Sequence, residues 1–99
     1  MPDTEAIAEA PLRVACVQMC PTVGKKASNL TKSEEMIRTA AETGARLVAL
    51  PELANSGDMF QTREEAFELS ELIPQGETCG LWGSLASSLG VAIVAGICE

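Results

Sequence analysis

Glu52 is the residue of this sequence with the clearest potential for chemistry, because it follows directly on an apolar stretch at residues 46–50. Pro51 cannot donate a backbone hydrogen bond to a sheet, so a strand ending at Leu50 must stop there and turn. In an open parallel α/β sheet, ligands bind beyond the carboxyl ends of the strands. The sequence therefore predicts that Glu52 lies at a substrate-binding edge of a sheet.

Two interpretations of Glu52 follow from its neighbours. Leu50, Leu53 and Ala54 are apolar and predict partial desolvation, the condition under which a carboxylate serves as a general base near neutral pH. The other interpretation is a surface glutamate in a strand-to-loop turn, since most glutamates are solvated. The local residues leave both open.

Covalent and metal chemistry is limited by the other side chains. Histidine is absent, which excludes Ser-His and Cys-His pairs within these residues, and no Cys-x-x-Cys pair occurs. We therefore expect no metal site and no cofactor. Cys16 and Cys98 lie in apolar runs and are predicted to be core thiols, Cys20 lies in a turn before Pro21, and Cys79 lies in the first turn of an expected helix.

Three nearly continuous apolar runs, at residues 12–19, 46–50 and 91–97, are expected to form strands. Such runs are typical of parallel strands that are covered on both faces. Helices are expected between these strands, one after the first strand and two after the second, which gives an α/β fold with the order β-α-β-α-α-β.

The expected helices have recognisable ends. The first is predicted over about residues 29–43, with Ser28 or Asn29 as its cap and Gly44 after its end. A short helix opens at the capping box Thr62-x-x-Glu65, with Ala66, Phe67 and Leu69 on one side, and a third runs from Glu77 or Thr78 to Gly90. Only the first and third helices are long enough to cover the sheet, so one sheet face is expected to stay bare in these residues alone, or to meet further chain or a partner.

Composition narrows the class of protein. Ninety-nine residues with 46% hydrophobic and 21% charged side chains are typical of one folded domain, expected at residues 11–99 after a disordered leader at 1–10. The net charge of −7 argues against nucleic acid and anionic membrane surfaces as partners. With no run of about 20 apolar residues and no basic signal region, a cytoplasmic protein is predicted.

Several of these segments together resemble the opening portion of the nitrilase superfamily of carbon-nitrogen hydrolases. The matching elements are the run at residues 13–19 with Pro21, the helix ending at Gly44-Ala45, Leu50-Pro51-Glu52-Leu53, Ser56-Gly57 and Val94-Ala95-Gly96. The resemblance covers residues 12–99. It implies a four-layer αββα sandwich of which this chain is the N-terminal part.

The resemblance also implies a Glu-Lys-Cys triad that hydrolyses nonpeptide C–N bonds, with Glu52 matching the glutamate. The family's lysine and nucleophilic cysteine lie after later strands, so the 99 residues alone are expected to be inactive. Lys25 and Lys26 are predicted to be a solvated loop pair, and none of the four cysteines is proposed as the nucleophile. The alternative is a catalytically silent βαβ module that acts as a scaffold or binds a partner. A complete enzyme is expected to be a homo-oligomer.

The loop after Glu52 suggests the substrate class. Residues 53–60 look more like the amidase and N-carbamoyl hydrolase branches than like true nitrilases, so the expected partner is a small-molecule amide or carbamoyl substrate. Asp58 and Phe60 are the candidate substrate-binding residues. An acidic Asp58 at a pocket rim would favour an amine-bearing substrate, and an exposed loop aspartate is the alternative.

Overall fold

The computed structural model describes residues 11–57 and 60–99, which form an α/β unit with the expected order β-α-β-α-α-β. Strands β1 (Val14–Cys16), β2 (Leu47–Ala49) and β3 (Ala92–Val94) make one parallel sheet in the order β1-β2-β3. The predicted fold class is confirmed. The expected leader at residues 1–10 lies outside the described residues.

The strands are shorter than their apolar runs. Regular pairing covers three residues of each strand, and single hydrogen bonds continue the contact on both sides, such as those from Arg46 N to Arg13 O and from Leu50 N to Val94 O. The apolar residues continue past those that keep the regular pairing of the sheet, and the strands were therefore predicted too long.

Helix α2 (Lys26–Glu42) begins earlier than expected. Asn29 does not cap it: the Asn29 side chain accepts a hydrogen bond from Thr22 N and donates to Thr22 O, which ties the helix to the preceding loop. Gly44 lies past its end with φ of +94°, as predicted from the residue type.

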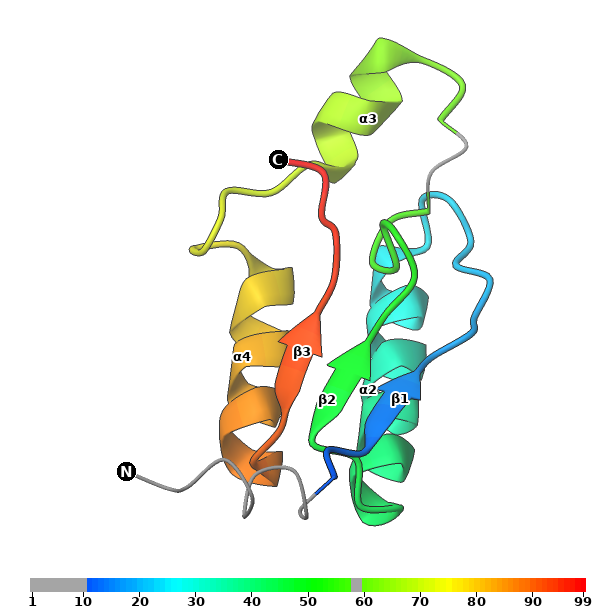
Figure 1. Cartoon of the computed structure of the whole chain (residues 1–99). Coiled ribbons are helices and arrows are strands. Elements are labelled where there is room, and N and C mark those ends of the chain that lie inside the picture. The colour runs from blue at the N-terminus through cyan, green and yellow to red at the C-terminus, as the bar shows by residue number, and fades with distance from the viewer. Residues whose placement is uncertain (1–10, 58–59) are drawn as a thin grey trace.

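Helix α3 (Arg63–Leu69) begins at the predicted capping box, and α4 (Glu77–Leu89) begins and ends where the sequence indicated. Thr62 accepts a hydrogen bond from Glu65 N, and Gly90 adopts φ of +66° after α4. Helix α3 lies beyond the carboxyl ends of the strands, apart from α2 and α4 (Figure 1). None of its residues is buried, and Phe67 is 80% exposed, so the expected apolar side of α3 packs on little of the described chain.

Helices α2 and α4 pack against one another and cover one face of the sheet (Figure 1). Ile37 of α2, Val48 of β2 and Leu85 of α4 are buried in this core, and Trp82 Nε1 donates to Ser33 Oγ at 3.0 Å between the two helices. The described residues contain no helix long and apolar enough to cross a membrane.

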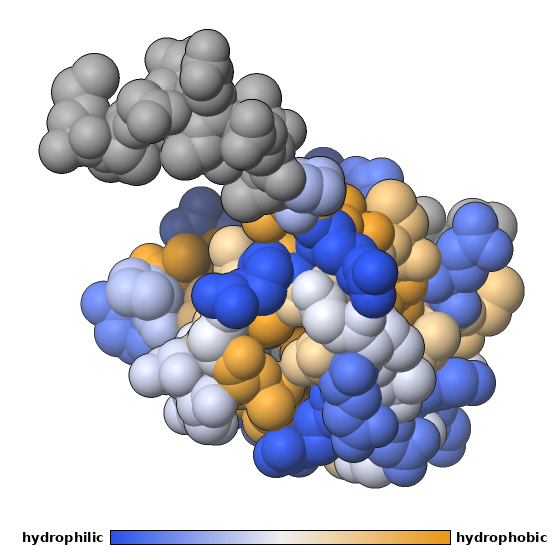
Figure 2. All heavy atoms as spheres, turned by 60° about the horizontal axis from the view of Figure 1, so that its bottom comes forward, coloured by the Kyte–Doolittle hydropathy of each residue, from blue (hydrophilic) through white to orange (hydrophobic). Residues whose placement is uncertain are grey.

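The other face of the sheet is not covered by any described residue, as the helix lengths predicted. Alternate strand residues point there, and Val14 and Val94 are 49% and 58% exposed. Cys16 is exposed as well, so its assignment as a core thiol was wrong: it lies on this uncovered face. Figure 2, which looks toward the end where the strands begin, shows hydrophobic surface among the polar side chains.

The isolated polypeptide of residues 1–99 is expected to self-associate and to bind a hydrophobic dye, because soluble monomers rarely expose an apolar sheet face. Sedimentation velocity and dye fluorescence measure both effects. Val94→Glu should reduce dye binding more than Phe67→Glu, although Phe67, on α3 and away from the sheet, is the more exposed residue. A compact monomer without dye binding would show that the uncovered sheet face does not drive self-association.

Candidate active site

Glu52 lies in a turn at residues 52–56, directly after the carboxyl end of β2. Two backbone hydrogen bonds tie this region to the extension of β3: Leu50 N donates to Val94 O at 2.9 Å, and Leu53 N donates to Gly96 O at 3.1 Å. A Cβ atom on Gly96 would be 3.8 Å from Glu52 Cγ, in ordinary van der Waals contact. The glutamate side chain therefore runs alongside Gly96 at the carboxyl edge of the sheet.

Glu52 is exposed to solvent. The partial desolvation expected from Leu50, Leu53 and Ala54 is wrong for the residues described, because Leu50 and Ala54 are buried in the core and do not cover the carboxylate. The general-base role of Glu52 remains a prediction.

The turn that follows Glu52 has an unusual backbone. Leu53 adopts φ of +51°, a left-handed conformation that costs a residue with a side chain about 1 kcal/mol, and its carbonyl accepts hydrogen bonds from Ser56 N and Gly57 N. Gly57 has φ of +80°, and a Cβ there would be 2.7 Å from Val23 Cγ2. The chain after Glu52 is thus packed closely against the loop that follows β1.

Asn55 attaches this turn to the residues around the first turns of α2 and α4. Its side chain is fully buried, and its Nδ2 donates hydrogen bonds of 3.1 Å each to Glu71 Oε2 and Thr78 Oγ1. Its backbone carbonyl accepts a 3.0 Å hydrogen bond from Asn29 Nδ2 of α2. The first turns of α2 and α4 therefore converge on one residue of the turn that carries Glu52.

Glu71 is the centre of a buried polar cluster. It accepts hydrogen bonds from Thr78 N at 2.8 Å and from the Thr78 hydroxyl, and it forms a 3.0 Å ion pair with Lys26 Nζ. Burial alone would raise the pKa of Glu71, but the hydrogen bonds from Thr78 and the nearby charge of Lys26 outweigh it and lower the pKa. The carboxylate form is thereby favoured.

Lys26 does not belong to a solvated pair as the sequence predicted. Its side chain is only 17% exposed and is held by Glu71, whose side chain is 7% exposed. Sequence reasoning also missed Glu71 and Asn55, which lie 16 residues apart and meet only in the folded chain. A glutamate within an otherwise apolar segment was the only signal of this contact.

The predicted substrate-binding residues are not brought together with Glu52 by any described contact. Asp58 lies outside the described residues. Phe60 is half-buried in the segment that leads to α3. Both roles remain predictions.

All four cysteines are free thiols. Cys79 lies in the first turn of α4 as expected, and Cys20 is exposed. Cys98 is only half-buried, with its sulfur 3.8 Å from Ala66 O, so its assignment as a core thiol was also wrong. In residues 11–57 and 60–99, no three side chains of the types that bind metals converge on one point.

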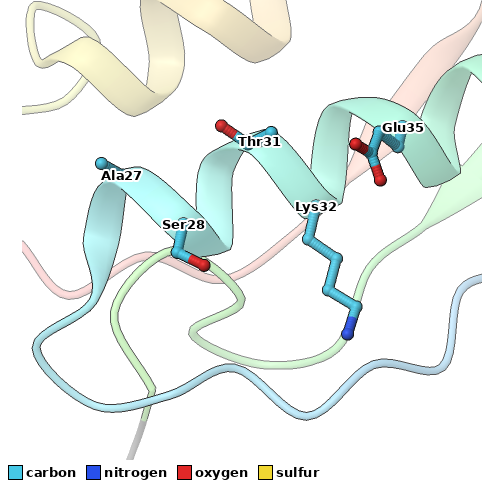
Figure 3. Close-up of a pocket in the computed structure, with 5 residues that line it drawn as sticks. All are labelled: Ala27, Ser28, Thr31, Lys32 and Glu35. Atoms are coloured by element: carbon cyan, nitrogen blue, oxygen red, sulfur yellow. The ribbon is translucent and has the colours of Figure 1, made fainter.

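A surface hollow on the exposed side of α2 is lined by residues of that helix alone, namely Ala27, Ser28, Thr31, Lys32 and Glu35 (Figure 3). In Figure 3 the Lys32 side chain extends away from the helix. Glu52 does not line this hollow, which therefore contributes nothing to the candidate active site.

Comparison with known proteins gives the family. The model of the carbon-nitrogen hydrolase family matches residues 13–99. A protein named nitrilase, from Pyrococcus abyssi (strain GE5 / Orsay), is 46% identical over 88 residues, which cover 89% of this chain and 34% of the relative. The chain thus spans about a third of the length of that relative. Because the family model matches most of the chain, the chain belongs to the carbon-nitrogen hydrolase family.

Proposed function

We propose that the full-length protein hydrolyses nonpeptide C–N bonds in small amide or N-carbamoyl substrates, with Glu52 as general base. The observation that carries this proposal is the position of Glu52, held at the carboxyl edge of the sheet by the bonds from Leu50 N and Leu53 N, in a chain of this family. That edge is where ligands reach open α/β sheets.

In the proposed mechanism, Glu52 takes the proton of a cysteine thiol, and the thiolate attacks the carbonyl carbon to form a tetrahedral intermediate. A lysine ammonium stabilises the oxyanion, a contribution of about 3 kcal/mol for a single donor. Glu52 then gives the proton to the leaving amine and afterwards removes a proton from the water that hydrolyses the acyl-enzyme. The thiol and the ammonium would come from later strands of the full-length protein.

The proposed partners follow from charge. The net charge of −7 on these 99 residues disfavours nucleic acid and anionic membranes as partners. We propose a small-molecule partner, and a full-length protein that acts in the cytoplasm as a homo-oligomer. Asp58 and Phe60 are proposed to contact the substrate.

A nitrile substrate is the second candidate, because the Pyrococcus abyssi relative is named a nitrilase. The sequence of residues 53–60 favours the amide and carbamoyl branches instead. Both chemistries would use the same glutamate.

A substrate panel separates the candidates. The full-length protein is incubated with a simple amide, an N-carbamoyl amino acid and a nitrile, and released ammonia is measured against Glu52→Gln. We expect ammonia from the amide or the carbamoyl compound at higher kcat/KM than from the nitrile. A preference for the nitrile would reassign the branch, and no release from any of the three would favour the silent scaffold.

A further inference from the structure

We propose that Asn55 is a positioning residue that fixes the turn carrying Glu52 to the buried cluster of Glu71, Thr78 and Lys26. This inference rests on the proposed function of Glu52 and adds a residue that holds it in place. Asn55 would not contact the substrate.

The first step of the argument is that Glu52 is held from two sides. Toward β3, Leu50 N and Leu53 N donate to the backbone of the β3 extension. On the other side, the turn passes in three residues from Glu52 to Asn55, whose side chain is completely buried. The position of the carboxylate therefore depends on both attachments.

The second step is the backbone conformation between these two points. Leu53, directly after Glu52, is held in a left-handed conformation, which persists only where its surroundings impose it. The bonds of Asn55 supply that restraint: Nδ2 donates to Glu71 and Thr78, and its carbonyl accepts from Asn29. Without them the turn is free to relax, and Glu52 moves with it.

The third step concerns the side-chain oxygen of Asn55, which is buried without a hydrogen bond to any described residue. Its Oδ1 atom is buried and has no partner within the part of the chain described, a loss of about 1–3 kcal/mol for an unpaired buried polar atom. The amide thus contributes through Nδ2, which donates to Glu71 in the segment before α4 and to Thr78 in the first turn of α4. Figure 1 shows that α2 and α4 both begin at this end of the sheet. The hydrogen bonds of Asn55 with Asn29 and Thr78 join the first turns of both helices to the turn that carries Glu52.

The test is Asn55→Ala in the full-length enzyme, with kcat, KM and the free energy of unfolding measured together. Because a misplacement of about 1 Å can reduce turnover about 100-fold, we expect kcat to fall about 10- to 100-fold. KM should change less than about twofold, because substrate contacts are retained.

Ser33→Ala is the matched control for a merely structural loss. Ser33 is equally buried; its hydroxyl donates to Leu30 O within α2 and accepts from Trp82 Nε1 of α4, and it makes no bond to the turn. It should lower stability by a similar amount and leave kcat unchanged. Equal effects of the two variants on kcat, or no effect of Asn55→Ala, would overturn the positioning role.

Combination with Glu52→Gln separates this inference from the proposed function. If Asn55 acts through Glu52, Asn55→Ala should reduce kcat no further in the Glu52→Gln enzyme, whereas the losses of stability should add. If the single variant Glu52→Gln keeps full kcat, the proposed function and the inference both fail. If Glu52→Gln loses kcat and Asn55→Ala keeps it, the inference fails and the proposed function stands.

If Asn55→Ala does not fold, Thr78→Val tests the positioning role of Asn55 instead. Valine keeps the shape of threonine but removes Oγ1, one of the two acceptors of Asn55 Nδ2. An intermediate loss of kcat with unchanged KM is expected. Full kcat in a folded Thr78→Val enzyme would contradict the positioning role.

Discussion

Glu52→Gln in the full-length enzyme is expected to lower kcat about 100- to 10,000-fold, the range that general acid-base catalysis supplies. Glutamine keeps the size and shape of the side chain but cannot accept the proton of a thiol. Steady-state ammonia release with the best substrate of the panel measures the loss.

The stability of the Glu52→Gln enzyme should be nearly unchanged, because the side chain is exposed and makes no hydrogen bond or ion pair with any described residue. Glu64→Gln, an exposed glutamate of α3, is the control and should keep full kcat. Loss of kcat in parallel with a lowered melting temperature would instead make Glu52 a structural residue.

Glu71→Gln is expected to lower the free energy of unfolding of the full-length enzyme by about 2 kcal/mol at neutral pH. The amide would direct an NH₂ group or a weaker acceptor toward Lys26 and Asn55, which now both donate to the carboxylate. Urea titration measures the difference. Glu77→Gln is the control: Glu77 is 67% exposed and 3.9 Å from Lys26, so its loss should be less than about 0.5 kcal/mol.

The pH dependence of this difference has a definite sign. The pKa of Glu71 lies below its ordinary value of 4.5 in the folded chain, so the ionised carboxylate contributes its full stabilisation above that value. The contribution is lost as the pH falls through the lowered pKa, and the wild type and Glu71→Gln should then converge. A difference that stays constant from neutral pH into strong acid would show that Glu71 does not act through its charge.

Features set by local chemistry could be predicted from the sequence. Pro51 ends β2, Thr62 caps α3, and Gly44 and Gly90 follow the ends of α2 and α4, because each depends on one residue's backbone or side chain. The order of elements followed from these boundaries and from the apolar runs between them.

Features set by distant partners could not be predicted in this way. Lys26 was assigned to solvent because nothing nearby in sequence shows that Glu71 pairs with it. Ser28 or Asn29 was predicted to cap the first helix, but the side chain of Asn29 bonds to the backbone of Thr22 and Asn55. Cys16 was placed in the core because an apolar run does not tell which sheet face is covered.

Single-turnover acylation of the full-length enzyme tests the central claim most directly. Enzyme in excess over substrate is quenched at short times, and the covalent acyl-enzyme is detected by intact mass in the wild type and in Glu52→Gln. The account predicts that the wild type forms the adduct and that Glu52→Gln forms it at least 100-fold more slowly. Acylation of Glu52→Gln at the wild-type rate would contradict the role of Glu52 as the general base.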